Sequence, residues 1–153
     1  MTLHEEVEAL RNIPLFAKID ASKLKLLAFT SERLNYEPGQ DLFKQGDPGD
    51  AAYIILEGQA DIIVNTPEGE LVVANMKKSD FVGDIAILCD VPRTATVRAT
   101  QPLSALVITK DLFFRLVTEF PDVSVEIMRE LAQRLHKTTQ DLLAARAAAK
   151  PDA

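Results

Sequence analysis

Two residues ten positions apart, Gly83 and Arg93, have the chemistry to hold a small anion. Glycine permits a sharp turn into a short helix over 83–88, and the first N–H groups of a helix lack partners within it. Arginine adds a planar fork of donors that suits a phosphate edge. Asp84 only accepts hydrogen bonds at neutral pH, so it suits a ribose 2′-hydroxyl and not the phosphate. A phosphate held beside a ribose hydroxyl describes a ribose cyclic phosphate.

The chain has 153 residues and a net charge of −6, and this charge is unevenly distributed. Residues 122–153 contain five basic and five acidic residues, so the whole excess of acid lies in residues 1–121. An acidic body repels phosphate backbones, which argues against nucleic-acid binding by this chain. A local positive pocket for a small anion is compatible with this charge.

The rare residue types exclude several classes of site. Cys89 is the one cysteine and His4 and His136 are the two histidines, so neither a disulfide framework nor a histidine-rich metal site fits a single chain. No apolar run approaches ~18 residues, and the acidic N-terminus does not have the order of a signal peptide. We therefore expect a cytoplasmic protein without membrane association, metal or other cofactor.

The pattern of apolar and turn residues predicts one α+β domain over residues 1–153. Two short helices are expected within residues 4–29, where Asp20 can cap the second one. Residues 32–109 contain strand-like runs cut every 8–12 residues by turns, which predicts an antiparallel β-roll, a jelly-roll-like double-stranded β-helix. The runs are ERLNY, DLFK, AAYIIL, QADIIV, LVVANM, ATVRAT and LSALVIT.

Helices return after Thr109, which can cap the segment 110–118, and Pro121 suits the first position of a long C-terminal helix. A narrow stripe recurs along this helix at spacings of three and four. Such a stripe indicates either packing on the helix's own body or a seam between two copies of the chain. The stripe consists of Ile127, Leu131, Leu135, Thr138 and Leu142.

The stretch from Phe81 to Val97 resembles the phosphate-binding cassette of cyclic-nucleotide-binding domains. Such domains occur in bacterial catabolite activators, in regulatory subunits of cyclic-AMP-dependent protein kinase and in cyclic-nucleotide-gated channels. The family pattern is roughly F-G-E-L-A-L, a short variable stretch, then P-R-x-A-T/S-V, and this chain has V-G-D-I-A-I-L-C-D-V-P-R-T-A-T-V. The turns Pro38-Gly39-Gln40 and Gln45-Gly46-Asp47 match as well, and the resemblance extends from about Ile13 to about Leu142.

Carried over position by position, the resemblance implies that Arg93 binds the cyclic phosphate of a nucleotide. Gly83 and the backbone amides of Ile85 and Ala86 would contact the same group. The implied ligand is cyclic AMP or cyclic GMP, and the residues leave both open.

The resemblance also implies contacts to the ribose and the base. Asp84 stands where the family usually has a glutamate for the 2′-hydroxyl, and it is one methylene shorter. Thr94 matches a position where a hydroxyl favours guanine in some relatives, and Thr96 is expected to face the same pocket. Apolar contact to the base is expected from among Val72, Val73 and Val97.

The function that follows from the resemblance is that of a non-catalytic regulatory sensor. Ligand draws the cassette over 81–96 closed, and a hinge at Phe113 and Phe114 follows. The helices over 110–147, including Leu131, then fold over the base as a lid. This movement changes the exposed surface of the C-terminal helix, to which a protein effector or a second copy of the chain in a homodimer is expected to bind.

Two alternatives to the sensor stay open. In the first, the chain is a fragment of a transcriptional regulator of the catabolite activator family. In the second, it is a degenerate fold that has lost its ligand and serves as a protein-interaction module. The helix-turn-helix domain of ~60–80 residues that follows in the activators is missing from this chain, so a stand-alone sensor is expected. An enzyme on a similar small barrel is not expected, because the clustered histidines that would hold its metal are missing.

Overall fold

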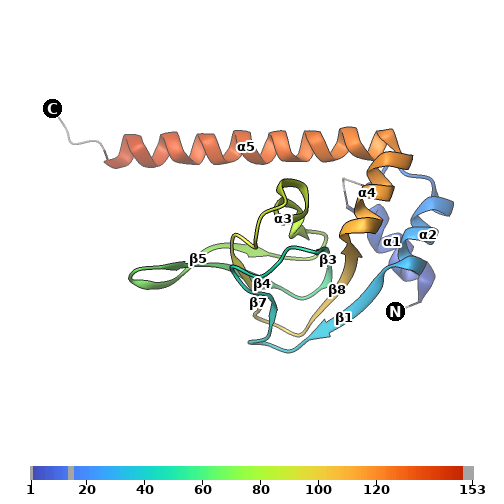
Figure 1. The fold of residues 1–153 in the computed structure, drawn as a ribbon, viewed down its shortest axis with the longest axis horizontal. Helices are drawn as coiled ribbons and strands as arrows, with labels where there is room; N and C mark the ends of the chain where they lie inside the picture. The colour runs from blue at the N-terminus through green and yellow to red at the C-terminus, as the bar shows by residue number, and fades with distance from the viewer. Residues whose placement is uncertain (1, 14–15, 150–153) are drawn as a thin grey trace.

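The computed structural model describes residues 2–13 and 16–149, apart from the side chains of Asp84 and Ile85. Within these residues, eight strands form two four-stranded antiparallel sheets, with the orders β1-β8-β3-β6 and β2-β7-β4-β5. The two sheets form the β-roll that the sequence predicts (Figure 1). The first sheet contains β1 (Glu32–Tyr36), β3 (Ala51–Glu57), β6 (Phe81–Val82) and β8 (Leu103–Thr109). The second contains β2 (Asp41–Phe43), β4 (Ala60–Thr66), β5 (Gly69–Met76) and β7 (Thr96–Ala99).

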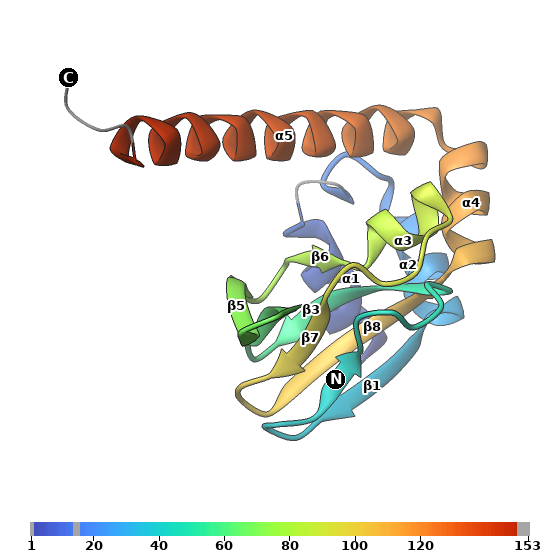
Figure 2. The same cartoon turned by 60° about the vertical axis from the view of Figure 1, so that its left-hand side comes forward.

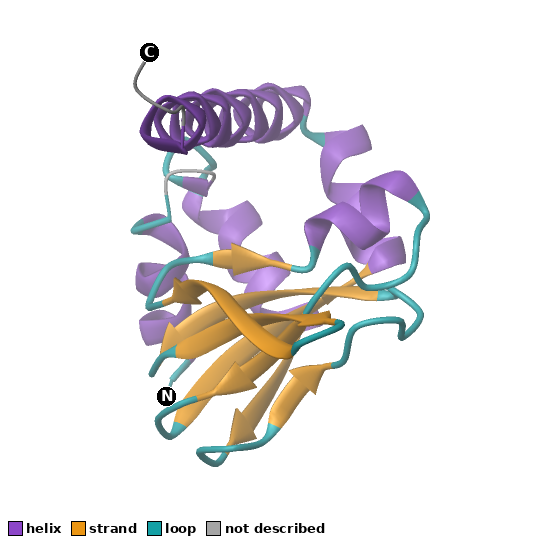
Figure 3. Cartoon of the chain, turned by 90° about the vertical axis from the view of Figure 1, so that its left-hand side faces the viewer, coloured by secondary structure: helices purple, strands orange, loops and turns teal. Residues whose placement is uncertain are grey.

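Strands β3 and β8 are buried on both faces, which explains why their sequences are apolar without alternation. Successive side chains of a strand point to opposite faces, so neighbouring residues of β3 enter different cores. Tyr53 and Ile55 pack inside the roll, while Ala52 and Ile54 pack outward against the helices. The first sheet is therefore the middle layer, between the second sheet and the helices (Figure 3).

The core between the first sheet and the helices is called the outer core here. Three shorter helices pack into it: α1 (Leu3–Arg11), α2 (Ala21–Thr30) and α4 (Lys110–Glu119). The inward faces predicted for the first two are confirmed, because Val7, Leu10, Leu24, Leu27 and Ala28 are buried. Thr109 caps α4 as predicted, since its hydroxyl accepts a hydrogen bond from Leu112 N–H at 3.2 Å. The predicted cap on α2 is wrong in one respect: Asp20 stands at the N-cap, but its side chain makes no capping hydrogen bond.

The long helix α5 (Pro121–Ala149) lies across the roll, and the short helix α3 (Asp84–Cys89) lies between it and the sheets (Figure 2). The predicted stripe on α5 divides into two parts. Ile127 is buried and Leu131 is partly buried, and both pack on the outer core, whereas Leu135 and Leu142 are exposed. The first part of the stripe therefore packs on the body, while Leu135 and Leu142 are exposed further along the same face of the helix.

Among the residues that the structure describes, none of the helices combines the length and apolarity needed to cross a bilayer.

Candidate ligand site

The turn from β6 into α3 requires glycine for two reasons. Gly83 has φ of 93°, a left-handed conformation that side chains with a Cβ disfavour. A Cβ on Gly83 would also lie 2.7 Å from Nη1 of Arg93 and 3.1 Å from the carbonyl oxygen of Ala51. The predicted short helix over 83–88 is confirmed one position later, with Gly83 as its N-cap.

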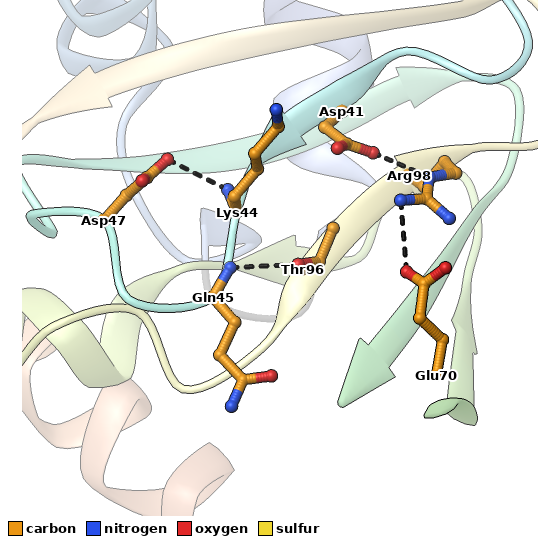
Figure 4. Close-up of polar contacts among 7 residues, drawn as sticks. All are labelled: Asp41, Lys44, Gln45, Asp47, Glu70, Thr96 and Arg98. Carbon is orange, nitrogen blue, oxygen red and sulfur yellow. Dashed lines mark hydrogen bonds and ion pairs between the residues drawn. The ribbon is translucent and has the colours of Figure 1, made fainter. Parts of the chain in front are cut away.

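The backbone of Arg93 is held by the turn that joins β2 to β3. Arg93 N–H donates to the carbonyl of Asp47 at 2.8 Å, and Gly46 N–H donates to the carbonyl of Arg93 at 2.9 Å. A side chain within this turn stabilises it: the carboxylate of Asp47 accepts a hydrogen bond from Lys44 N–H at 3.1 Å (Figure 4). The Gln45-Gly46-Asp47 motif therefore positions the arginine, although it lies almost fifty residues earlier in the sequence.

The side chain of Arg93 is buried, with a relative exposure of 3%. Its Nη1 donates to the carbonyl of Gly83 at 3.0 Å and its Nη2 donates to the carbonyl of Ala51. Its Nε has no hydrogen-bond partner among the described residues. Because a guanidinium stays protonated at neutral pH, the structure holds a buried positive charge with an unused N–H group.

Two aromatic rings lie close to this guanidinium. Its Cζ lies 4.0 Å from the ring centroid of Phe43 and 5.8 Å from that of Tyr53. Burial lowers the pKa of Arg93, while Tyr53, Asp50 and Asp47 act in the opposite direction. A buried charge that is disfavoured in this way gains from an anion that reaches it.

Arg93 lines a cavity of about 520 Å³ between the roll and α5. The cavity is large enough for a small organic ligand. Its wall combines apolar strand residues, the cassette and one face of α5. The lining residues are Phe43, Ile62, Val73, Ala74, Asn75, Met76, Phe81, Val82, Gly83, Ala86, Arg93, Thr94, Ala95, Val97, Arg134, Lys137, Thr138 and Asp141.

The structure brings three of the residues predicted to contact the phosphate to one cavity wall: Gly83, Ala86 and Arg93. Thr94, predicted to contact the base, lines the same cavity. The side chain of Asp84, predicted to meet a ribose hydroxyl, lies outside the described residues, as does that of Ile85.

Thr96 lies apart from the cavity lining. Its side chain is buried, and its hydroxyl accepts a hydrogen bond from Gln45 N–H at 2.9 Å (Figure 4). The hydroxyl therefore joins β7 to the turn after β2. Of the three valines considered for the base, Val73 and Val97 line the cavity, whereas Val72 is exposed and does not.

Four polar residues of α5 that the cassette motif does not include also line the cavity: Arg134, Lys137, Thr138 and Asp141. Their spacing places them on one face of the helix, and this spacing is visible in the sequence. A polar helix face is normally solvated, however, so only the packing of α5 across the roll distinguishes it from an ordinary surface.

The residues expected to act as a hinge lie where α4 meets the cassette. Phe113 is buried and its ring stacks on that of Phe81 in β6, with 6.0 Å between the centroids. Phe114 packs edge-on against Phe113 at 5.9 Å, and Leu131 packs on the outer core. Phe81 directly precedes the Val82–Gly83 turn, so the stack connects α4 to the start of the cassette.

The chain thus combines a β-roll with a buried cationic group on the wall of a helix-covered cavity. Residues 33–120 match the sequence model of the family described as Cyclic nucleotide-binding domain. The chain therefore belongs to this family, and the resemblance of its cassette is confirmed.

Its relatives include regulators of two kinds. The chain is 28% identical over 136 residues to the CRP-like cAMP-activated global transcriptional regulator of Mycobacterium tuberculosis, covering 88% of this chain and 61% of the regulator. It is 37% identical over 108 residues to the cAMP-dependent protein kinase regulatory subunit of Eremothecium gossypii, covering 71% of this chain and 23% of the subunit.

The fold is shared with a solved structure, the Thermus thermophilus Catabolite Activator Protein. The TM-score is 0.79 at 24% identity, over 86% of this chain and 62% of that protein. This chain thus spans less than two thirds of the length of each of these three proteins.

Proposed function

We propose that this chain is a non-catalytic sensor module that binds a purine cyclic mononucleotide with its phosphate against Arg93. The observation that carries the proposal is the buried guanidinium, whose Nε has no partner among the described residues, beside Gly83 on the wall of the cavity. A cyclic phosphate brings one negative charge and several acceptor oxygens, which this group lacks. Hydrogen bonds between charged partners are stronger than those between neutral ones.

The remaining contacts that we propose are those that the family resemblance implies for residues close to this arginine in the sequence. Gly83 and the amides of Ile85 and Ala86 complete the phosphate site, and Asp84 accepts from the ribose hydroxyl. Thr94 faces the base, with apolar contact from Val73 and Val97. Thr96 is left out of the set, because its hydroxyl already accepts from Gln45.

Calorimetric titration with cyclic AMP and cyclic GMP tests the proposal. Cyclic AMP is the first ligand to test, because the names of both relatives contain it. We expect saturable heat for one site per chain with at least one of the two. Arg93→Lys keeps the charge but loses the planar fork, and it should weaken binding by about 2 kcal/mol or more, roughly 30-fold.

Absence of both heat and a thermal shift at millimolar concentrations of either nucleotide would contradict the proposal. The degenerate interaction module would then be the better interpretation.

We further propose that binding moves α5 through the Phe81–Phe113 stack. Cys89 is exposed and is the one cysteine of the chain, so it accepts a spin label without further engineering. A second label at Ala144→Cys on α5 completes a pair for distance measurement. Saturating nucleotide should change the distance distribution, and Phe113→Leu should reduce the change while binding persists. An unchanged distribution in fully liganded protein would contradict the lid.

The output surface that we propose is a second stripe on α5, formed by Val125, Met128, Ala132, Leu135, Thr139 and Leu142. The spacings alternate between three and four, which is the period of a left-handed coiled coil. The four large apolar members are 44–67% exposed. A second copy of the chain carries the same stripe and so matches it in a two-fold symmetric dimer. A protein effector that binds the same stripe is the alternative to a second copy. A cytoplasmic location of the protein stays a prediction.

A further inference from the structure

Phe43 has an unusual place among the residues that line the cavity. It ends the three-residue strand β2, and its ring centroid lies 4.0 Å from Cζ of Arg93. Tyr53 lies behind it, with 5.5 Å between the two ring centroids. None of the ligand contacts proposed above uses this ring.

The strand that carries Phe43 is firmly attached to the second sheet. Phe43 is paired with Val97 in β7, and Arg98 of β7 donates to the carboxylate of Asp41 at 2.8 Å (Figure 4). At the other side of Phe43, Gln45 N–H donates to the hydroxyl of Thr96. These contacts fix a ring that would otherwise sit on a very short strand.

The guanidinium needs more than its two hydrogen bonds to stay buried. Gly83 and Ala51 accept from two of its edges, but each supplies a neutral carbonyl. Among the side chains that the structure describes, none forms an ion pair with Arg93. The face of an aromatic ring attracts a cation, and it does so more strongly where water is excluded.

We propose that Phe43 is a positioning residue for the anion site: its ring holds the Arg93 guanidinium in place by a cation–π contact without neutralising it. A carboxylate in the same place would cancel the positive charge that a phosphate must meet. The ring leaves that charge intact and leaves Nε unpaired. This inference rests on the proposed function, because the held charge is useful only if an anion binds.

The first test observes Arg93 itself in ligand-free protein. The Nε–H signal of Arg93 is assigned in a ¹⁵N spectrum by its loss in Arg93→Lys, and its hydrogen exchange is then measured. We expect exchange at least tenfold faster in Phe43→Leu than in the unaltered protein, and restored protection in Phe43→Tyr. Leu34→Ala, which trims the same core outside the cavity lining, controls for loss of packing.

Unchanged exchange in a folded Phe43→Leu protein would overturn the inference, and so would equal acceleration in Leu34→Ala. This readout needs no ligand. If neither cyclic nucleotide binds the unaltered protein, the proposed function fails while the protection of Nε–H still reports on Phe43.

The second test keeps the shape of the ring, so it does not depend on how well a leucine variant folds. Phenylalanine at position 43 is replaced by analogues with one, two and three fluorines, which progressively weaken the negative face of the ring. We expect the affinity for the cyclic nucleotide to fall stepwise, to about one tenth with three fluorines. A flat series, with unfolding midpoints unchanged, would overturn the positioning role.

Discussion

The carbonyl oxygen of Gly83 accepts a hydrogen bond from Nη1 of Arg93 at 3.0 Å, so the two ends of the cassette are in direct contact. The glycine is needed at this distance, because a Cβ there would be 2.7 Å from the same nitrogen. The arginine is therefore hydrogen-bonded directly to the turn that begins α3.

Gly83→Ala should damage both stability and binding. A non-glycine residue at this φ costs on the order of 1–3 kcal/mol, and the added methyl also displaces the guanidinium. Gly39→Ala is the matched control, since Gly39 has φ of 92° but no atom within 4 Å of the added Cβ. We expect both variants to lose stability in urea unfolding, and only Gly83→Ala to lose more than tenfold in nucleotide affinity. Equal affinities would show that the close approach is unimportant.

Asp84→Glu should strengthen binding if the carboxylate accepts from the ribose hydroxyl, because the longer side chain matches the usual residue of the family. Asp84→Asn keeps the size but removes the charge, and it should weaken binding by about 1–2 kcal/mol, roughly 5- to 30-fold. Titration with the 2′-deoxy cyclic nucleotide provides the control, since neither variant should alter its affinity. A gain for Asp84→Glu with the deoxy ligand would mean that the carboxylate acts elsewhere.

The tyrosines should ionise late in the folded protein. Burial, with smaller contributions from Tyr53 and Glu32, raises the pKa of Tyr36 to about 12, and burial also raises the pKa of Tyr53. Because the folded pKa exceeds the unfolded value of about 10, the folded state keeps its proton longer. This contribution to stability is present in full below pH 10 and is lost as the pH rises from about 10 to about 12.

The absorbance of tyrosinate measures this directly, because the chain has two tyrosines and no tryptophan. Tyr36→Phe should remove the step near pH 12 and flatten the corresponding loss of stability relative to the unaltered protein. A full two-tyrosine step near pH 10 in protein that is still folded would contradict the expected shift.

Leu135→Asp should separate the proposed dimer, because it places a charge within the exposed stripe of α5. Gln133→Asp adds the same charge to the same helix outside the stripe. Light scattering after size exclusion should give a dimer for the unaltered protein and for Gln133→Asp, and a monomer for Leu135→Asp. A monomer in all three proteins, with and without nucleotide, would assign the stripe to another partner.

The strands were predictable because their determinants are local. Proline or glycine marks the corner after β1 and the corner before β8, and the Val, Ile and Thr of β8 favour a strand, so both strands begin and end where the sequence places them. The two-residue strand β6 was missed because Phe81 and Val82 are too few to show a pattern. Their pairing with β3 is a tertiary event.

The stripe on α5 shows a different limit. The sequence offers several overlapping series at spacings of three and four, and the predicted one mixed buried, cavity-lining and exposed positions. Ile127 and Thr138 belong to different environments only because the helix lies across a curved surface. Periodicity defines a face of a helix, but the neighbour of that face is decided by packing.

By itself, the sequence determined the family, the order of elements and the pair Gly83 and Arg93, because a turn conformation and a motif depend on residues close together in the chain. Only the tertiary structure decided what surrounds the arginine: the ring of Phe43 fifty residues earlier, and the face of α5 forty residues later. The tertiary structure also decided that the Thr96 hydroxyl accepts a hydrogen bond from Gln45 N–H. Such contacts join distant segments, and no local preference encodes them, since they follow from how two sheets and a helix pack around one core.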